Sequence, residues 1–108
     1  MARRLSSSKG SLTFHNSRLG IVVVVTKPAQ TMIGAERVPE FVRLLTEMMD
    51  ALGCTNAYVG RDGSAVGVWI HHRQGWTHKL KLQRKKGFEV RPTEAELREF
   101  HEKYGAAP

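Results

Sequence analysis

Two runs of alternating apolar and polar residues, separated by a short glycine-containing segment, place the strongest constraint on the fold. The first run alternates valine and isoleucine with Gly67, Trp69 and His71 over residues 66–72. The second alternates a tryptophan, a histidine and two leucines with threonine and lysine over residues 76–82. A period of two is typical of half-buried strands, which turn one face to a core and the other to water. The sequence therefore predicts an antiparallel hairpin with one exposed face.

The register of this hairpin follows from the requirement that its apolar residues share one face. A two-residue turn at residues 74–75 would set core positions opposite exposed positions, whereas a three-residue loop over residues 73–75 keeps the faces matched. The predicted pairs are His72 with Trp76, Ile70 with His78, Val68 with Leu80, Val66 with Leu82, Trp69 with Lys79 and His71 with Thr77.

A strand and a helix are predicted before these runs. Residues 19–26 are nearly continuous isoleucine and valine, which predicts a strand buried on both faces, and Pro28 then opens a loop. An apolar stripe at helical spacing follows this loop, with opposite charges on its other side. It predicts a helix that begins near Glu36 or Pro39 and ends at Leu52, before a glycine.

Residues 56–61 predict a further short strand, and Asp62 and Gly63 form a strong signal for a hairpin turn. A two-residue loop at this position pairs Val59 with Val66 and Tyr58 with Gly67. Three antiparallel strands should therefore follow one another as a meander. After it, residues 92–93 open a last helix, in which Thr93 and Glu96 fit a capping box.

The predicted element order is β-α-β-β-β-α, which indicates an α+β domain over residues 18–108. We expect a mostly antiparallel four-stranded sheet with two helices on one face. The first strand should lie parallel to a strand of the meander, because a helix connects the two. The opposite face of the sheet would be left open.

Residues 1–17 are rich in serine and basic residues and have no helical or strand periodicity, which predicts a flexible basic arm carrying Arg3, Arg4 and Lys9. No apolar stretch has the length of a secretory signal or a membrane span, and Cys54 is the only cysteine. We therefore expect a cytoplasmic protein without membrane contact. In a eukaryotic source the same arm would also fit a mitochondrial transit peptide.

The charge distribution predicts an anionic partner. The chain carries a formal net charge of +7, and the positive charge is concentrated in two parts of the sequence. Residues 1–30 hold five basic and no acidic side chains, and residues 54–92 hold eight and two. The helical segments are acidic on balance. Basic strands and a basic arm favour nucleic acid over a membrane surface.

From residue 36 to about residue 104, the element order resembles double-stranded-RNA-binding domains and the Alu-binding proteins of the signal recognition particle. This resemblance lies in topology and implies RNA binding. Double-stranded-RNA-binding domains open their last helix with a lysine-rich motif, whereas residues 93–96 here are Thr-Glu-Ala-Glu. We therefore expect binding through the sheet face and the basic loop over residues 84–86.

The sequence accordingly predicts a non-enzymatic protein that binds RNA or single-stranded DNA without a cofactor. Exposed rings can stack on unpaired bases, and lysine and arginine can neutralise phosphates. The predicted site comprises Tyr58, Trp69, His71, Lys79, Lys81, Arg84, Lys85 and Lys86, with Arg3, Arg4 and Lys9 of the arm. The alternative is a homodimeric adaptor or inhibitor module that uses the same aromatic face on protein.

Enzymatic alternatives have less support in the sequence. His71 and His78 could serve a metal-independent ribonuclease as base and acid. The predicted register, however, directs His71 outward and His78 inward. No metal site is expected, because the chain has no Cys-x-x-Cys pair and no carboxylate or cysteine close to these histidines in sequence.

Overall fold

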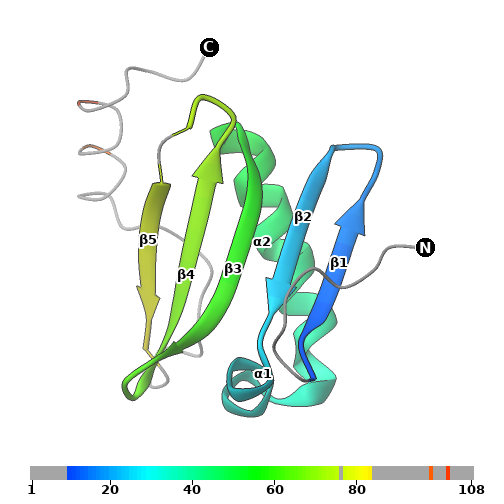
Figure 1. Ribbon diagram of the computed structural model, residues 1–108, viewed down its shortest axis with the longest axis vertical. Helices are drawn as coiled ribbons and strands as arrows, with labels where there is room; N and C mark the ends of the chain where they lie inside the picture. Colours follow the sequence, from blue (N-terminus) through cyan, green and yellow to red (C-terminus); the bar gives the residue numbers. More distant parts are fainter. Residues whose placement is uncertain (1–9, 76, 84–97, 99–101, 103–108) are drawn as a thin grey trace.

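The computed structural model describes residues 10–75, 77–83, 98 and 102 of the chain (Figure 1). A sheet lies in front of a long helix in this view. The elements are β1 (Leu12–Asn16), β2 (Ile21–Val25), α1 (Lys27–Ile33), a short 3-10 turn (Ala35–Arg37), α2 (Val38–Leu52), β3 (Cys54–Asp62), β4 (Ala65–His72) and β5 (Thr77–Leu82).

The sheet has five strands in the order β1-β2-β3-β4-β5. Neighbouring strands are antiparallel except for β2 and β3, which run parallel and are joined through α1 and α2. The α+β class and the parallel placement of the valine-rich strand are therefore confirmed. The expectation of four strands was wrong, because β1 adds a strand at the edge.

Strand β1 is formed by residues that were predicted to belong to a flexible arm. It pairs with β2 so that Leu12 faces Val25 and Asn16 faces Ile21. The turn between them is closed by the Gly20 amide, which donates to the Asn16 carbonyl at 2.8 Å. Pairing with β1 satisfies backbone hydrogen-bonding groups along the outer edge of β2. The pattern of apolar residues in this short segment does not show that contribution. The arm residues Arg3, Arg4 and Lys9 lie outside the described residues.

Helix α1 replaces most of the loop that was predicted to begin at Pro28. Thr26 occupies the N-cap position, Pro28 lies in the first turn, and Ala29 and Ile33 are buried. A threonine followed closely by proline is a recognised start of a helix, so the signal was present in the sequence. The short length of the helix and its single pair of buried residues made the signal weak.

Helix α2 confirms the predicted main helix. It runs over Val38–Leu52 and ends at Gly53, which adopts a left-handed conformation with φ 78°. Its apolar stripe packs against the sheet, and Leu45 and Met49 are completely buried there. The stripe and the sheet form one core, whose members include Val23, Val25, Phe41, Val42, Val59, Val68, Ile70 and Leu80.

The two faces of the sheet differ in burial. In β2, Ile21, Val23 and Val25 are buried on the α2 side, whereas Val22 and Val24 on the other side are only half-buried. The prediction that this strand is buried on both faces was therefore wrong for one face. The predicted last helix lies outside the described residues apart from Arg98 and Glu102, which are both helical.

The register of the β4–β5 hairpin is confirmed over its described pairs. Val66 faces Leu82, Val68 faces Leu80, Trp69 faces Lys79, Ile70 faces His78 and His71 faces Thr77. Gly75 has φ 102°, as the three-residue loop requires. The predicted pair of His72 with Trp76 cannot be compared, because Trp76 lies outside the described residues.

The register of the β3–β4 hairpin differs from the prediction. Asp62 faces Ala65, so the two-residue loop is Gly63–Ser64 and Gly63 takes φ 64°. Val59 therefore faces Val68 and not Val66, and Tyr58 faces Trp69 and not Gly67. A shift of two residues keeps every side chain on its face, so apolar parity could not choose between the registers.

His72 links the end of β4 to the end of α2 and should make stability depend on pH. Burial lowers its pKa, and the positive charge of Arg73 lowers it further. The folded state therefore binds the proton less readily than the unfolded state. We expect the free energy of unfolding to be highest above the unfolded pKa of about 6.5 and to fall as the pH drops through the lower folded pKa.

Urea denaturation at pH 7.5 and pH 5 measures this effect, with His72→Gln as the comparison variant. The wild-type chain should lose more stability than the variant between the two pH values. The Gln74 amide also donates to His72 Nδ1 at 3.0 Å, a hydrogen bond that a protonated ring cannot accept. An identical loss in both chains would contradict the assignment.

Candidate nucleic-acid interface

The sheet face opposite α2 carries most of the predicted site. We call it the open face. Its residues alternate along β2 to β5 and are Val22, Val24, Asn56, Tyr58, Gly60, Gly67, Trp69, His71, Thr77, Lys79 and Lys81. Tyr58 and Trp69 face each other across β3 and β4 at its centre, with ring centroids 5.9 Å apart and planes inclined by 56°. The Tyr58 side chain is exposed, whereas Trp69 is half-buried.

Two glycines form a floor beneath the indole of Trp69. Gly60 and Gly67 face each other across the same strand pair. A Cβ atom on Gly67 would lie 2.7 Å from Trp69 Cη2, and one on Gly60 would lie 3.5 Å from Trp69 Cζ3. The ring therefore occupies space that a side chain on Gly67 would need, whereas a Cβ on Gly60 would be in ordinary contact with it. The register set by the Gly63–Ser64 loop brings the two glycines together, which the predicted register would not.

The Lys79 ammonium group lies close to both the Trp69 ring and the Asp62 carboxylate. Its Nζ lies 5.1 Å from the centroid of the Trp69 ring and 2.7 Å from Asp62 Oδ2. The hydrogen bond from Lys79 lowers the pKa of Asp62, and the charges of Lys79 and Lys81 act in the same direction. Lys81 is exposed and has no ion-pair partner among the described residues. Lys81 is thus the better placed of the two to meet a phosphate.

The two histidines considered for catalysis point to opposite faces of the sheet. His71 is exposed on the open face, where its Nδ1 lies 2.9 Å from Thr77 Oγ1. His78 faces Ile70 on the side of the core and is half-buried. A shared base and acid for one substrate would require both rings on the same side.

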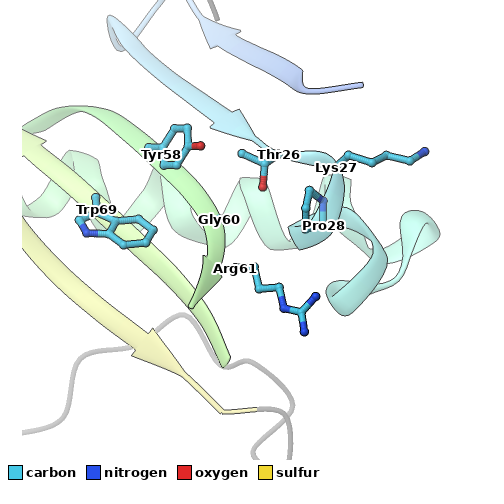
Figure 2. Close-up of a pocket in the computed structure, with 7 residues that line it drawn as sticks. All are labelled: Thr26, Lys27, Pro28, Tyr58, Gly60, Arg61 and Trp69. Carbon is cyan, nitrogen blue, oxygen red and sulfur yellow. The ribbon is translucent and has the colours of Figure 1, made fainter. Parts of the chain in front are cut away.

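Cations that the sequence analysis did not select lie beside the aromatic pair. Lys27 and Arg61 border a pocket of about 270 Å³, which is also lined by Thr26, Pro28, Tyr58, Gly60 and Trp69 (Figure 2). From the sequence, Lys27 had been placed directly after a predicted strand and Arg61 at the end of another. The helix-start signal at residues 26–28 could have shown that Lys27 lies at the start of a helix. The proximity of Lys27 to Tyr58, however, depends on the parallel pairing of β2 and β3.

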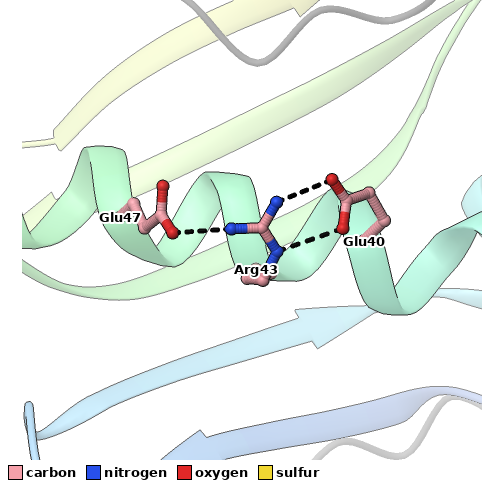
Figure 3. Close-up of polar contacts among 3 residues, drawn as sticks. All are labelled: Glu40, Arg43 and Glu47. Carbon is pink, nitrogen blue, oxygen red and sulfur yellow. Dashed lines mark hydrogen bonds and ion pairs between the residues drawn. The ribbon is translucent and has the colours of Figure 1, made fainter.

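The exposed side of α2 offers little free positive charge. Arg43 contacts Glu40 and Glu47 at 2.7 Å each, so its charge is balanced within the helix (Figure 3). A larger hollow of about 760 Å³ lies between this helix and the β1–β2 hairpin. Arg43 and Glu47 both line it. Arg18 lines the same hollow from the β1–β2 turn.

The remaining predicted site residues, Arg84, Lys85 and Lys86, lie outside the described residues. Within the described part of the chain, no three His, Cys, Asp or Glu side chains are grouped to hold a metal ion. No helix of that part is long and apolar enough to cross a membrane. Cys54 is buried, and burial raises the pKa of its thiol to about 11.

Comparison with models of protein families, with curated proteins and with solved structures found no match to this chain. We therefore infer function from the geometry and charge of the open face.

Proposed function

We propose that this protein binds single-stranded nucleic acid, RNA or DNA, on the open face. The observation that carries the proposal is the Tyr58–Trp69 pair, which lies on a glycine floor with cations on two sides. Lys79 and Lys81 flank the rings from β5, and Lys27 and Arg61 flank them from the end of β2 and β3. Single strands are recognised by two components, aromatic rings that stack on bases and cations that contact the phosphate backbone.

The shape of the surface favours unpaired over duplex nucleic acid. Aromatic rings held in a sheet can stack on bases only when the bases are not paired with a second strand. The long helix α2 packs its apolar stripe on the core and shows a balanced Glu40–Arg43–Glu47 cluster to solvent, so it is poorly suited to enter a major groove. Stacking should supply about 1 to 3 kcal/mol for each base.

A binding titration with labelled oligonucleotides at several salt concentrations tests the proposal. We expect a single strand to bind more tightly than a duplex of the same sequence. The logarithm of the binding constant should fall linearly with the logarithm of salt concentration, by about 0.7 for each phosphate contacted on a single strand. Absence of binding at low salt to a folded monomer would refute the proposal.

The rival function is a homodimeric or protein-interaction module that uses the same face. Val22 and Val24 are half-buried there and Tyr58 is 41% exposed, which leaves apolar surface that a protein partner could cover. Sedimentation with and without oligonucleotide separates the two functions. A tight dimer that ignores nucleic acid at low salt would favour the rival.

A further inference from the structure

The pocket beside the aromatic pair lies where the parallel strands β2 and β3 reach their carboxyl ends. Thr26 follows β2, Lys27 and Pro28 begin α1, and Arg61 lies near the end of β3. Figure 2 shows the rings of Tyr58 and Trp69 on one side of this space and the Lys27 and Arg61 side chains on the other. The residues around this pocket of about 270 Å³ thus include two aromatic rings and two cationic residues, whose charged ends extend outward from the rings.

Gly60 forms the floor of the pocket. A Cβ atom at this position would lie 3.2 Å from Tyr58 Cε2, 3.5 Å from Trp69 Cζ3 and 3.8 Å from Thr26 Oγ1. The missing side chain thus opens a space that the two rings and the threonine hydroxyl surround. Gly60 does not have a positive φ, so the close approach and not the backbone conformation gives glycine its role here.

Thr26 brings an unused hydroxyl to this space. The residue is only 6% exposed, and its Oγ1 has no hydrogen-bond partner in the described part of the chain. Its backbone groups are satisfied, because its amide donates to the Val59 carbonyl at 2.9 Å and its carbonyl accepts from the Gln30 amide at 3.0 Å. Burial of an unpaired hydroxyl is unfavourable. The Oγ1 atom is itself covered, so it would reach a ligand oxygen only if the pocket opened slightly.

Lys27 and Arg61 supply charge suited to a phosphate. Both are exposed, and neither forms an ion pair with any residue that the structure describes. The Arg61 Nε donates to the Gly63 carbonyl at 3.0 Å, which orients the side chain at the rim. Guanidinium and ammonium groups form strong charge-assisted hydrogen bonds to phosphate oxygens.

We propose that this pocket is a subsite for one nucleotide, with its base against Tyr58 and Trp69 and its phosphate between Lys27 and Arg61. The inference rests on the proposed function and deepens it, because it fixes where one unit of the strand binds. A nucleoside monophosphate combines the aromatic ring and the anion that the two sides of the pocket require.

The experiment is an NMR titration of the full chain with AMP and UMP, with the matching nucleosides, and with inorganic phosphate. Amide shifts should localise to residues 26, 27 and 58–61 and include the Trp69 indole, and the monophosphates should bind more tightly than nucleoside or phosphate alone. Lys27→Gln and Arg61→Gln should each weaken monophosphate binding by roughly tenfold, the value of a charge-assisted hydrogen bond of about 1.4 kcal/mol. Nucleoside binding should not change.

Arg18→Gln is the matched control, because it removes an exposed positive charge from the β1–β2 turn, outside the pocket. Gly60→Ala fills the floor and should weaken both monophosphate and nucleoside. If Lys27→Gln and Arg61→Gln act no more strongly than Arg18→Gln, the subsite is wrong. Oligonucleotide binding without any mononucleotide response also overturns the subsite but leaves the proposed function standing. Mononucleotide binding with the expected variant pattern, but without oligonucleotide binding, supports the subsite and refutes single-strand binding.

Discussion

Replacing Gly67 with alanine should destabilise the fold by about 1 to 3 kcal/mol, the usual cost of excess volume in a packed site. The new Cβ would lie 2.7 Å from Trp69 Cη2, 2.9 Å from Trp69 Cζ3 and 3.2 Å from Asp62 Cβ. Gly67 does not have a positive φ, so alanine at an open position of the strand would instead gain about 0.5 to 1 kcal/mol. A loss of stability on Gly67→Ala would therefore show that the indole lies over Gly67, and a gain would show that it does not.

A double-mutant cycle with Trp69→Ala isolates this contact. In the chain that already lacks the indole, Gly67→Ala should be close to neutral or stabilising, because the atoms at 2.7 and 2.9 Å are gone. We expect a coupling of about 0.5 to 3 kcal/mol between the two positions, measured by urea denaturation. Gly60→Ala serves as the comparison, since its nearest neighbour would be Tyr58 Cε2 at 3.2 Å. Additive changes would show that the ring does not occupy this site.

Trp69→Ala should also weaken binding to a single-stranded oligonucleotide by about 1 to 3 kcal/mol, which is roughly 5-fold to 150-fold in affinity. The salt dependence should stay nearly unchanged, because stacking on a base releases no counterions. The measurement is a titration at several salt concentrations on variants first shown to be folded. Loss of affinity together with a much flatter salt slope would contradict a stacking role for this ring.

Lys81→Gln should give the complementary result and flatten the salt slope by about 0.7 to 0.9, the value of one phosphate contact. Replacing Lys79 as well would double this change if both lysines met phosphates. The Lys79 ammonium, however, already contacts Asp62 at 2.7 Å, so we expect the single Lys81 change to account for most of the effect.

The oligomeric state of the Trp69→Ala chain decides between the two proposed functions. Should Trp69→Ala keep full affinity for the oligonucleotide but turn a dimer into a monomer, the open face is a protein interface. Analytical ultracentrifugation of both chains at the concentrations of the titration provides this control.

The sequence alone determined the parts of the fold that depend on local periodicity. Alternation and side-chain parity were enough to predict the β4–β5 register and the pairing of Trp69 with Lys79. The spacing of apolar residues, with proline near one end and glycine at the other, predicted α2 and its buried stripe. A helix between two strands also predicted that β2 runs parallel to a strand of the meander, and in the structure that strand is β3. These signals are encoded within a few turns or one hairpin, so no distant contact is needed to interpret them.

The tertiary structure alone decided the parts that depend on partners far apart in the sequence. Strand β1 gains its order from the edge of β2, and the Lys79–Asp62 contact arises only when β3, β4 and β5 are aligned. Side-chain parity could not predict the β3–β4 register, because a shift of two residues leaves every side chain on the same face of the sheet. The observed register sets Gly60 opposite Gly67, beside the indole of Trp69. That register places Tyr58 beside Trp69, and the parallel β2 brings Lys27 to the same pocket.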